Sequence, residues 1–327
     1  MARHPFRILV DVDPSAPAQP ALVQALDLAA RLGGRVTAVA VLGDVPRRAR
    51  AFVTREVEDG LVAHLAGELA AAVASVRSDV KVATEVLRGK HARTVIAAAV
   101  SGKADLLMRS HGVHSGGLPT PFGPIDMNLL RHCPCPVWIV DVRVGKRIRR
   151  VLAAVNTNRT EQNQQGLNRR ILEQALQLSE AEDAALTVLE VWEVFGEELL
   201  RPRLADREVR GLLEETRAGA ERDLDEFLAP FRARLEAATV ELQRGDPAEL
   251  IPGYVVEHGI DLVVMGTVAR TGIAGLLMGN TAERVLRRLH GSVVAVKPPG
   301  FVDPGVEQMV RPAPGRVPAP RSTTRKR

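Results

Sequence analysis

The stretch IDLVVMGTVARTGIAGLLMGNTAERVL, residues 260–286, decides how this chain folds. A short apolar run is followed by a glycine-containing segment, and apolar residues then recur at helical spacing. A buried strand that leads through such a turn into a helix is typical of parallel α/β sheets. Glycines let backbone amides approach an anion closely, and a helix that begins near Asn280 or Thr281 offers free amides and a positive dipole end. The stretch therefore predicts an anion-binding turn.

The same pattern occurs earlier in the chain. The run ADLLM at 104–108 matches IDLVV at 260–264, and Gly123 matches Gly279 at the same offset. The offset is smaller at the start of each unit, where RILVDVD at 7–13 matches RVLAAVN at 150–156. The chain therefore contains two copies of one unit, and the second copy has thirteen extra residues before its fourth strand.

Strand and helix patterns alternate within each copy, which predicts right-handed crossovers and a parallel, doubly wound sheet. The fold class is α/β: two tandem five-stranded Rossmann-like domains, at residues 1–145 and 146–300, followed by a tail at 301–327. The predicted strands are 8–12, 36–42, 80–87, 105–108 and 137–141 in the first copy, and 151–155, 186–191, 239–242, 262–265 and 293–296 in the second. The predicted helices of the first copy are 19–32, 47–76, 92–101 and 126–132.

The net charge of +5 comes from the C-terminal tail. Residues 311–327 hold six basic residues and no acidic one, so the remainder of the chain carries a net charge of −1. The tail is also rich in proline, serine and threonine, which predicts disorder. We expect a solubilising tail, with a nucleic-acid-binding arm as the less favoured alternative.

The N-terminal residues, the apolar runs and the two cysteines indicate the cellular compartment of the protein. The N-terminus enters a strand almost at once, without the apolar run of a signal peptide, and no stretch approaches the ~18 apolar residues of a membrane-spanning helix. Cys133 and Cys135 are one residue apart, a poor disulfide spacing that suits a reducing compartment. We therefore expect a cytoplasmic protein that does not contact a membrane.

Several catalytic and cofactor motifs are missing from the chain. The turn in the second copy lacks the GK[ST] end of a P-loop, and the dinucleotide fingerprint does not follow the first strand. We find no Ser-His-Asp arrangement and no carboxylate pair whose spacing demands catalysis. The sequence argues against P-loop NTPases and dehydrogenases, and it favours a protein that is not an enzyme.

The segment MGTVARTGIAGLLMGNTAERVL, residues 265–286, resembles the signature of universal stress proteins. In ATP-binding members the pattern is Gly, two residues, Gly, nine residues, Gly, and then Ser or Thr. Gly266 and Gly279 match its first and third glycines, whereas Ala269 replaces the second. Asn280 stands where Ser or Thr is expected, with Thr281 one place later. The resemblance covers both copies, about residues 5–300. The runs GNTAE and CPCPVW resemble the tandem E-type members in particular.

The resemblance implies a stress-response regulatory protein with a nucleotide site, for ATP or a related nucleotide, in the second copy. In nucleotide-binding relatives an acidic residue at the end of the first strand contacts the adenosine, and Asn156 occupies that place here. Adenine is then expected near Val155, Asn156 and Val191, with phosphates at Gly266, Gly279, Asn280 and Thr281. The predicted cofactor-binding set is Val155, Asn156, Val191, Met265, Gly266, Ala269, Gly279, Asn280 and Thr281.

The first copy has lost this pattern. Of the matched glycines only Gly123 remains, and Pro124, which has no amide hydrogen, follows it. We therefore predict a degenerate nucleotide site in the first copy. Asp11 and Asp13, at the end of its first strand, are expected to cap the following loop.

The resemblance also implies how the copies associate. Single-domain relatives commonly dimerise through their last strand, so strands 137–140 and 293–296 would pair within this chain as a pseudo-dimer. That pairing would satisfy two exposed sheet edges. A further homodimer and unidentified regulatory protein partners are also expected.

Three other hypotheses remain open at this stage. Nucleotide binding could be followed by slow hydrolysis, although no base is identifiable. The chain could instead be an interaction scaffold that holds an apolar ligand in the first copy, near Leu118, Pro119, Pro121 and Phe122. A zinc site is a further alternative that we do not favour, because its candidate ligands do not have a strong metal-binding spacing. Those candidates are His111, His114, Cys133 and Cys135.

Overall fold

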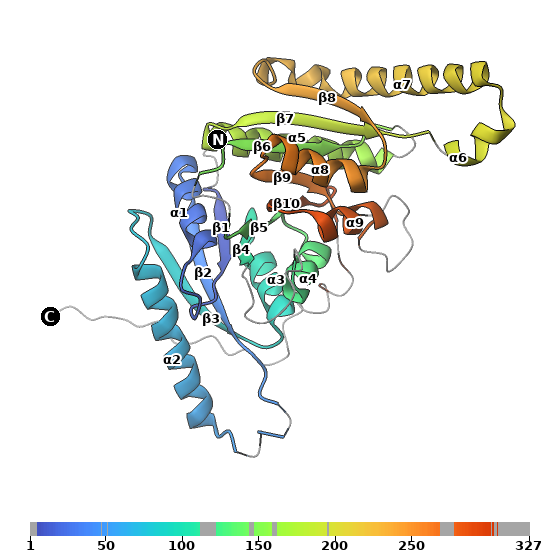
Figure 1. The fold of residues 1–327 in the computed structure, drawn as a ribbon. Coiled ribbons are helices and arrows are strands. Elements are labelled where there is room, and N and C mark those ends of the chain that lie inside the picture. Colours follow the sequence, from blue (N-terminus) through green and yellow to red (C-terminus); the bar gives the residue numbers. More distant parts are fainter. Residues whose placement is uncertain are drawn as a thin grey trace.

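A computed structural model describes residues 5–46, 48–50, 52–111, 122–143, 147–158, 162–194, 196–268, 278–301, 303 and 306. In these residues one ten-stranded sheet runs in the order β3-β2-β1-β4-β5-β10-β9-β6-β7-β8 (Figure 1). The strands are β1 (Arg7–Asp11), β2 (Arg35–Leu42), β3 (Val82–Arg88), β4 (Leu106–His111), β5 (Val137–Asp141), β6 (Arg150–Val155), β7 (Ala185–Trp192), β8 (Thr239–Arg244), β9 (Leu262–Gly266) and β10 (Ser292–Val296).

Each half of the sheet is a parallel five-stranded unit, and we call the unit with β1–β5 domain 1 and the unit with β6–β10 domain 2. The two units meet where β10 pairs with β5 in the antiparallel direction, with Trp138 opposite Val294. The predicted pseudo-dimer is therefore confirmed, and it makes one continuous sheet. The strand order reverses between β1 and β4 and again between β6 and β9, and ligands bind at such points in doubly wound folds.

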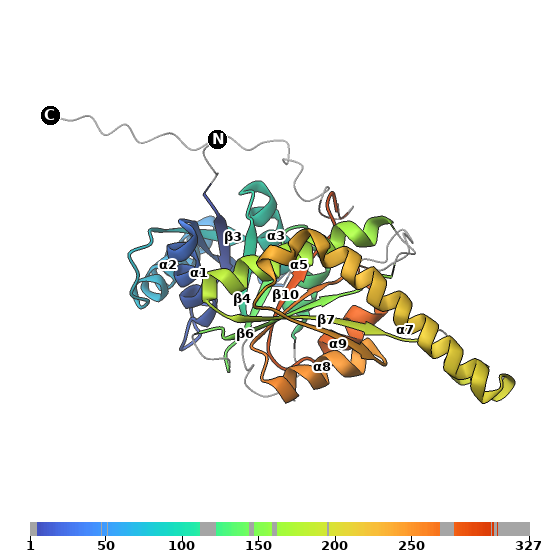
Figure 2. The same ribbon diagram turned by 90° about the horizontal axis from the view of Figure 1, so that it is seen from above.

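Helices cover both faces of the sheet, as a doubly wound fold requires (Figure 2). The helices that contribute apolar residues to one buried cluster are α1 (Pro20–Leu32), α2 (Arg55–Ala74), α5 (Gln162–Glu182) and α7 (Asp206–Leu228). The second cluster draws on α3 (His91–Ser101), α4 (Pro124–His132), α8 (Pro247–His258) and α9 (Asn280–Arg288). Three short segments complete the described helices: α6 (Glu197–Leu200), η1 (Arg201–Arg203) and η2 (Ala229–Arg234).

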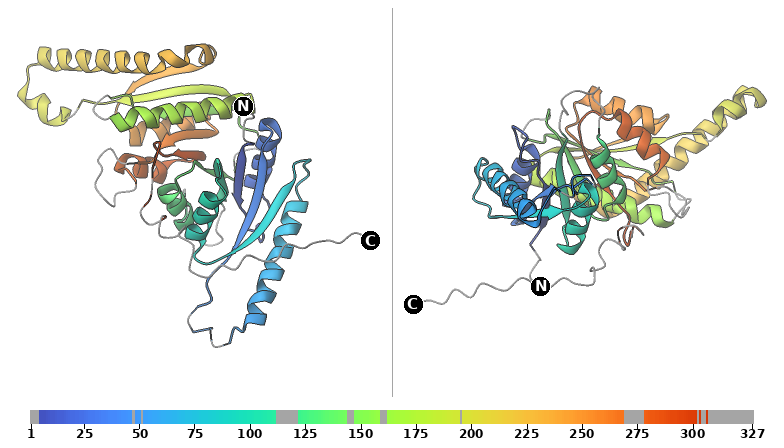
Figure 3. Two further views of the ribbon diagram at one scale, coloured as in Figure 1. Left: turned by 180° about the vertical axis from the view of Figure 1, so that it is seen from behind. Right: turned by 90° about the horizontal axis from the view of Figure 1, so that it is seen from below.

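Burial follows the position of each strand in the sheet. Every residue of the central strands β5 and β10 is buried, whereas the edge strands β3 and β8 are largely exposed. Trp138 in β5 is fully buried at the domain junction. The long helices α2 and α7 lie at opposite ends of the sheet (Figure 3).

The strand registers locate the extra residues of domain 2. They match strands β6, β7 and β8 to β1, β2 and β3 through the pairs Arg150 and Arg7, Ala185 and Arg35, and Thr239 and Ala83. By this alignment the extra residues fall into two groups of similar size, one before β7 and the other before β8. The second group lies in the connection that contains α6, η1 and α7.

The helix predicted at 47–76 is shorter in the structure. It begins at Arg55, because the Thr54 side chain accepts a hydrogen bond from the Val57 amide (3.4 Å) and caps the helix there. Pro46 lies in the turn that precedes it.

A buried polar contact joins the domains on the α1/α5 face. Glu182 at the end of α5 accepts a hydrogen bond from Gln24 Nε2 (2.8 Å) and pairs with Arg31 Nη1 (2.6 Å) from α1. Burial raises the pKa of Glu182 above its ordinary value.

The structure bears in part on the predictions about the membrane, the tail and the domain boundaries. No helix among the described residues has both the length and the hydropathy to cross a membrane. The tail from residue 307 onward lies outside the described residues, so its disorder stays a prediction, as do the domain boundaries at 145/146 and 300/301.

Candidate functional site

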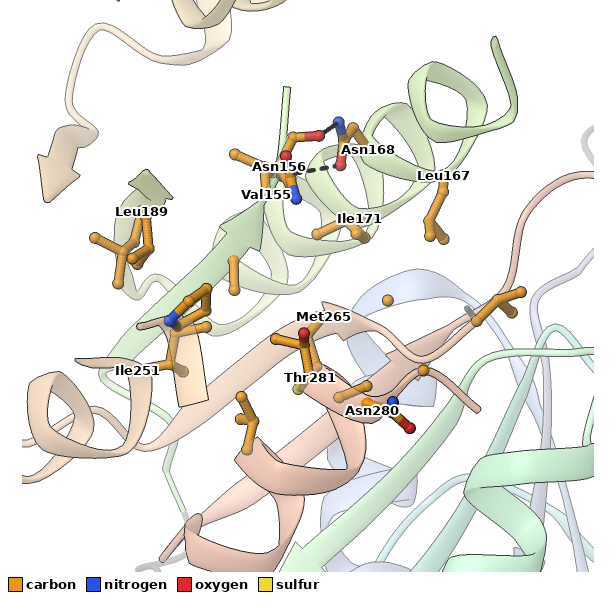
Figure 4. Close-up of a pocket in the computed structure, with 18 of the residues that line it drawn as sticks. Val155, Asn156, Leu167, Asn168, Ile171, Leu189, Ile251, Met265, Asn280 and Thr281 are labelled. Atoms are coloured by element: carbon orange, nitrogen blue, oxygen red, sulfur yellow. Dashed lines mark hydrogen bonds between the residues drawn. The ribbon is translucent and has the colours of Figure 1, made fainter. Parts of the chain in front are cut away.

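A cavity of about 350 Å³ lies beyond the carboxyl ends of β6 and β9, at the switch point of domain 2 (Figure 4). This volume is in the range of small-molecule sites, and its wall is divided almost evenly between polar and apolar surface. Its lining residues are Ala154, Val155, Asn156, Leu167, Asn168, Ile171, Leu189, Val191, Glu193, Pro247, Ile251, Met265, Gly266, Val268, Gly279, Asn280, Thr281, Ala282 and Val285.

The cavity brings together the described members of the predicted site. Val155 and Asn156 lie on one side of it, and Met265, Asn280 and Thr281 lie on the other (Figure 4). Val191, Gly266 and Gly279 line it as well, whereas Ala269 lies outside the described residues.

Sequence reasoning missed the part of the wall that comes from α5 and α8. Leu167, Asn168 and Ile171 of α5 line the cavity, and so do Pro247 and Ile251 of α8. An apolar residue on a helix that covers a sheet has the same pattern whether it faces a cavity or the core. Asn168 is different, because a buried amide in the first turns of a helix signals a hydrogen-bonding task.

Buried polar side chains fix the turn that follows β6. Asn168 Oδ1 accepts a hydrogen bond from the Asn156 amide (3.2 Å), and Asn168 Nδ2 donates to the Asn156 carbonyl. Beside them, Glu190 accepts bonds from the Thr157 amide (3.1 Å) and from the Thr157 hydroxyl (2.7 Å). Burial raises the pKa of Glu190. The strand end that carries Val155 and Asn156 is therefore held before any ligand binds.

The start of α9 is suited to an anion. Gly279 is the N-cap residue, and no described side chain caps this helix. The first intrahelical bond runs from the Glu283 amide to the Gly279 carbonyl (2.9 Å). The amides of Asn280, Thr281 and Ala282 therefore precede the intrahelical ladder and lie at the positive end of the helix dipole, beside the cavity. Such amides are the usual phosphate ligands at helix N-termini.

Domain 1 has ionisable side chains at four positions that correspond to lining residues of the domain 2 cavity. The strand registers and helix starts equate Asp11 with Ala154, His91 with Pro247 and Arg109 with Met265. The N-cap residues of α4 and α9 are also equivalent, and their alignment equates Asp126 with Ala282. All four of these positions in domain 2 line the cavity, so their domain 1 counterparts lie in the corresponding region.

These charged side chains of domain 1 bind one another. Arg109 pairs through Nη1 with Asp11, and through Nε with Asp126 Oδ1 at 3.0 Å. His91 Nε2 lies 2.8 Å from Asp11, and His111 Nδ1 lies 3.0 Å from Asp126 Oδ2. Burial opposes the charge of Arg109, but Asp11 and Asp126 raise its pKa above the ordinary value.

The Asp126 carboxylate lies at the start of α4, where domain 2 has its free amides. It accepts a hydrogen bond from the Gly123 amide at 2.9 Å. Burial disfavours its ionisation, but the bond with His111, the charge of Arg109 and the Gly123 amide hold its pKa below the ordinary value. Domain 1 thus carries its own anion at this position, which gives a physical reason for the predicted degeneracy beyond the missing amide of Pro124.

The prediction that Asp11 caps a loop is wrong. Asp11 is 2% exposed and pairs with Arg109 and His91, so it belongs to the buried network. Asp13 does cap the loop, because it accepts bonds from the Ser15 amide (3.1 Å) and hydroxyl (2.7 Å).

The zinc hypothesis gains no support from the candidate ligands. His111 is bound to Asp126, and His114 lies outside the described residues. Cys133 and Cys135 are free thiols with their Sγ atoms 3.3 Å apart. In the described ranges no group of three or more potential ligands could hold a metal ion.

Known proteins match both halves of the chain. The model of the universal stress protein family matches residues 6–141 and 148–297. Universal stress protein E of Salmonella typhi is 26% identical over 318 residues, which cover 91% of this chain and 96% of the relative. A universal stress protein E homolog of Haemophilus influenzae is 31% identical over 183 residues, 54% of this chain and 57% of the relative.

Solved structures share the fold at low identity. A Pseudomonas aeruginosa UCBPP-PA14 protein assigned to the universal stress proteins has a TM-score of 0.64 at 24% identity, over 93% of this chain and 96% of its own. A universal stress protein of Archaeoglobus fulgidus has a TM-score of 0.59 at 16% identity, over 89% and 98% of the two chains. The tandem family match, the ten-stranded sheet and the cavity at the switch point agree: this chain belongs to the universal stress protein family.

Proposed function

We propose that domain 2 binds one adenine nucleotide, ATP or a close relative, and that this binding is the regulatory input of a stress-response protein. The observation that supports this most is the contrast between the two switch points. In domain 2 no described side chain caps the start of α9, which adjoins a cavity with both apolar and polar walls, whereas in domain 1 ion-paired side chains lie in the equivalent region. A cavity with one anion-binding end suits a ligand that joins a flat apolar base to phosphates.

The proposed ligand has one orientation in this cavity. The base would lie by Val155, Asn156 and Val191, beyond the end of β6. The phosphates would lie by Gly266, Gly279, Asn280 and Thr281, with Met265 between the two ends. Ala269 belongs to the same proposed set by its place in the sequence. Binding would then alter a surface that a regulatory partner recognises.

The experiment introduces the carboxylate of domain 1 at the equivalent position of domain 2. Ala282→Asp places a carboxylate where Asp126 lies in domain 1, and it should compete with the phosphates for the α9 amides. We expect calorimetry with ATP and magnesium to show saturable binding by the wild type, weakened at least about thirtyfold in Ala282→Asp.

Ala282→Asn is the matched control, because it has the same shape without the charge. It should lose much less affinity than Ala282→Asp. Equal affinities in all three proteins would place the ligand elsewhere and contradict the proposal.

A second candidate function rests on the apolar part of the wall. Leu167, Ile171, Leu189 and Ile251 would equally suit a neutral apolar ligand in an interaction scaffold. Native mass spectrometry of the purified protein separates the two: a co-purifying nucleotide favours the first function, and a neutral lipid-like molecule favours the second. Hydrolysis of the nucleotide is the weaker proposal, because Glu193 is the sole carboxylate among the described lining residues.

We also propose a cytoplasmic location. The thiols of Cys133 and Cys135 are free at 3.3 Å, which suits a compartment that keeps thiols reduced.

A further inference from the structure

Lys297 is a buried cation at the junction of the two domains. It follows β10 directly and is 1% exposed. Its Nζ donates to the carbonyl of Leu130 in α4 of domain 1 (2.7 Å) and to the hydroxyl of Thr267. The Thr267 hydroxyl in turn donates to the same Leu130 carbonyl (3.2 Å). Both acceptors are neutral groups, so neither of these bonds neutralises the charge of the ammonium.

Thr267 connects this cation to the proposed phosphate end. Its carbonyl accepts the hydrogen bond of the Gly279 amide (3.0 Å), and Gly279 is the N-cap residue of α9. Its neighbours Gly266 and Val268 both line the cavity. A single fully buried residue therefore separates Lys297 from the start of the helix.

The described lining residues of the cavity offer no positive charge. Glu193 is the charged side chain among its described lining residues, and it is acidic. A buried charge acts strongly over short distances because the protein interior screens it poorly. The position of Lys297 behind Thr267 would offset this deficit at the α9 end.

We infer that Lys297 is a positioning residue of the nucleotide site, which supplies buried positive charge behind the start of α9 and ties that start to α4 of domain 1. This inference rests on the proposed function. The ammonium would not touch the ligand and would act through Thr267 and the field at the α9 amides.

Domain 1 again provides a contrast. In the alignment that equates the N-cap residues of α4 and α9, Asp141 is the counterpart of Lys297, and His111 is the counterpart of Thr267. Domain 1 therefore carries a negative charge at this place, pairs it with Arg143 and holds an internal carboxylate at the start of α4. At this position the cation occurs in domain 2, where no described side chain caps the helix.

The groups around Lys297 make its charge sensitive to pH. Burial lowers its pKa from 10.5 to about 7, while Cys133 and Asp303 favour the charged form and Arg131 opposes it. His132 pairs with Asp303 at 2.6 Å, and the Phe301 ring centroid lies 5.3 Å from Nζ. Below neutral pH the cation is present, and above it the amine becomes neutral.

The test measures ATP affinity by calorimetry with magnesium at pH 6.0, 7.0 and 8.5 for the wild type and Lys297→Met. The titration of ATP itself cancels in the ratio of the two dissociation constants. We expect Lys297→Met to bind roughly tenfold more weakly at pH 6.0 and within about twofold of the wild type at pH 8.5. Lys81→Met, which removes an exposed lysine of domain 1, should match the wild type throughout.

Lys297→Arg keeps the inference testable if the Met variant folds poorly. Its charge persists at every pH, so it should exceed the wild type in affinity at pH 8.5 and equal it at pH 6.0. A loss that is the same at all three pH values would show a merely structural role and overturn the inference. Equal dissociation constants for the wild type and Lys297→Met at all three pH values would also overturn the inference. A wild type that binds no ATP would overturn the proposed function and the inference together.

Discussion

The switch points of the two domains differ at four equivalent positions. Domain 2 has a cavity there, and domain 1 has side chains that bind one another. Ala154, Pro247, Met265 and Ala282 leave a cavity in domain 2. In the counterpart region Asp11, His91, Arg109 and Asp126 bind one another on the same strand and helix framework. Burying these charges is costly unless each has a partner, so the network is expected to behave as a unit.

That expectation gives a non-additive stability prediction. Arg109→Met leaves Asp11 and Asp126 buried without their shared cation, and it should lower the free energy of unfolding by about 3–5 kcal/mol. The triple change Asp11→Ala, Arg109→Met and Asp126→Ala installs the side chains that domain 2 has at these positions, and it should be less destabilising than the single change. Urea unfolding measures both. If the triple variant lowers the free energy of unfolding by the sum of the three single-variant decreases, the network is not coupled and the prediction is wrong.

Lys297 gives a stability prediction that needs no ligand. Its pKa is about 7 in the folded state against an ordinary 10.5, so between these values the unfolded chain binds more protons. Stability should therefore rise with pH above 7, and the full cost of the buried charge applies below it.

Relative to Lys297→Met, the wild type should gain about 2 kcal/mol of unfolding free energy between pH 7 and pH 9. Denaturant titrations at both pH values measure this gain, with Lys81→Met as the exposed control. Parallel pH profiles for the wild type and Lys297→Met would show that the buried lysine keeps an ordinary pKa.

Sequence reasoning at this scale groups residues that a local motif places close together. Gly266, Gly279, Asn280 and Thr281 lie within one short stretch, and the structure places them around one cavity. The charged network of domain 1 could not be found in this way. Its members come from β1, α3, β4 and α4, and only the register of the sheet brings them together.

At the scale of elements, the turn from β6 into α5 holds one side of the cavity. Asn168→Leu removes both side-chain bonds to the Asn156 backbone and leaves that amide and carbonyl without these partners. We expect a loss of about 1–3 kcal/mol in unfolding free energy and weaker ATP binding.

Gln174→Leu on the same helix is the control for Asn168→Leu. Among the described residues Gln174 Nε2 is buried without a hydrogen-bond partner, so this change should be nearly neutral or stabilising. Thermal unfolding compares the two variants. Equal losses would show that the Asn168 bonds contribute nothing particular.

Element boundaries show where sequence patterns fall short. The helix predicted over 47–76 is longer than α2, which runs from Arg55 to Ala74. The Thr54 cap and the acidic residues Glu56 and Glu58 in the first turn marked the true start. A capping side chain stops a helix that its neighbours' propensities would extend.

At the scale of the whole molecule, the two domains share one sheet. The β5–β10 pairing, the Glu182 contacts and the Lys297 bonds all cross the junction. The internal repeat made this arrangement predictable, because equal units with equal edge strands can pair about a two-fold axis. What the repeat could not reveal is that the polar side chains of domain 1 bind one another, whereas their counterparts in domain 2 line a cavity.

The stoichiometry of nucleotide binding tests the central claim most directly, because it counts open switch points. Calorimetry of the full chain with ATP and magnesium should give one site per chain, and Ala282→Asp should weaken that site strongly. Two sites per chain would show that the domain 1 network does not close its switch point. No binding at millimolar ATP would show that the cavity of domain 2 is not a nucleotide site.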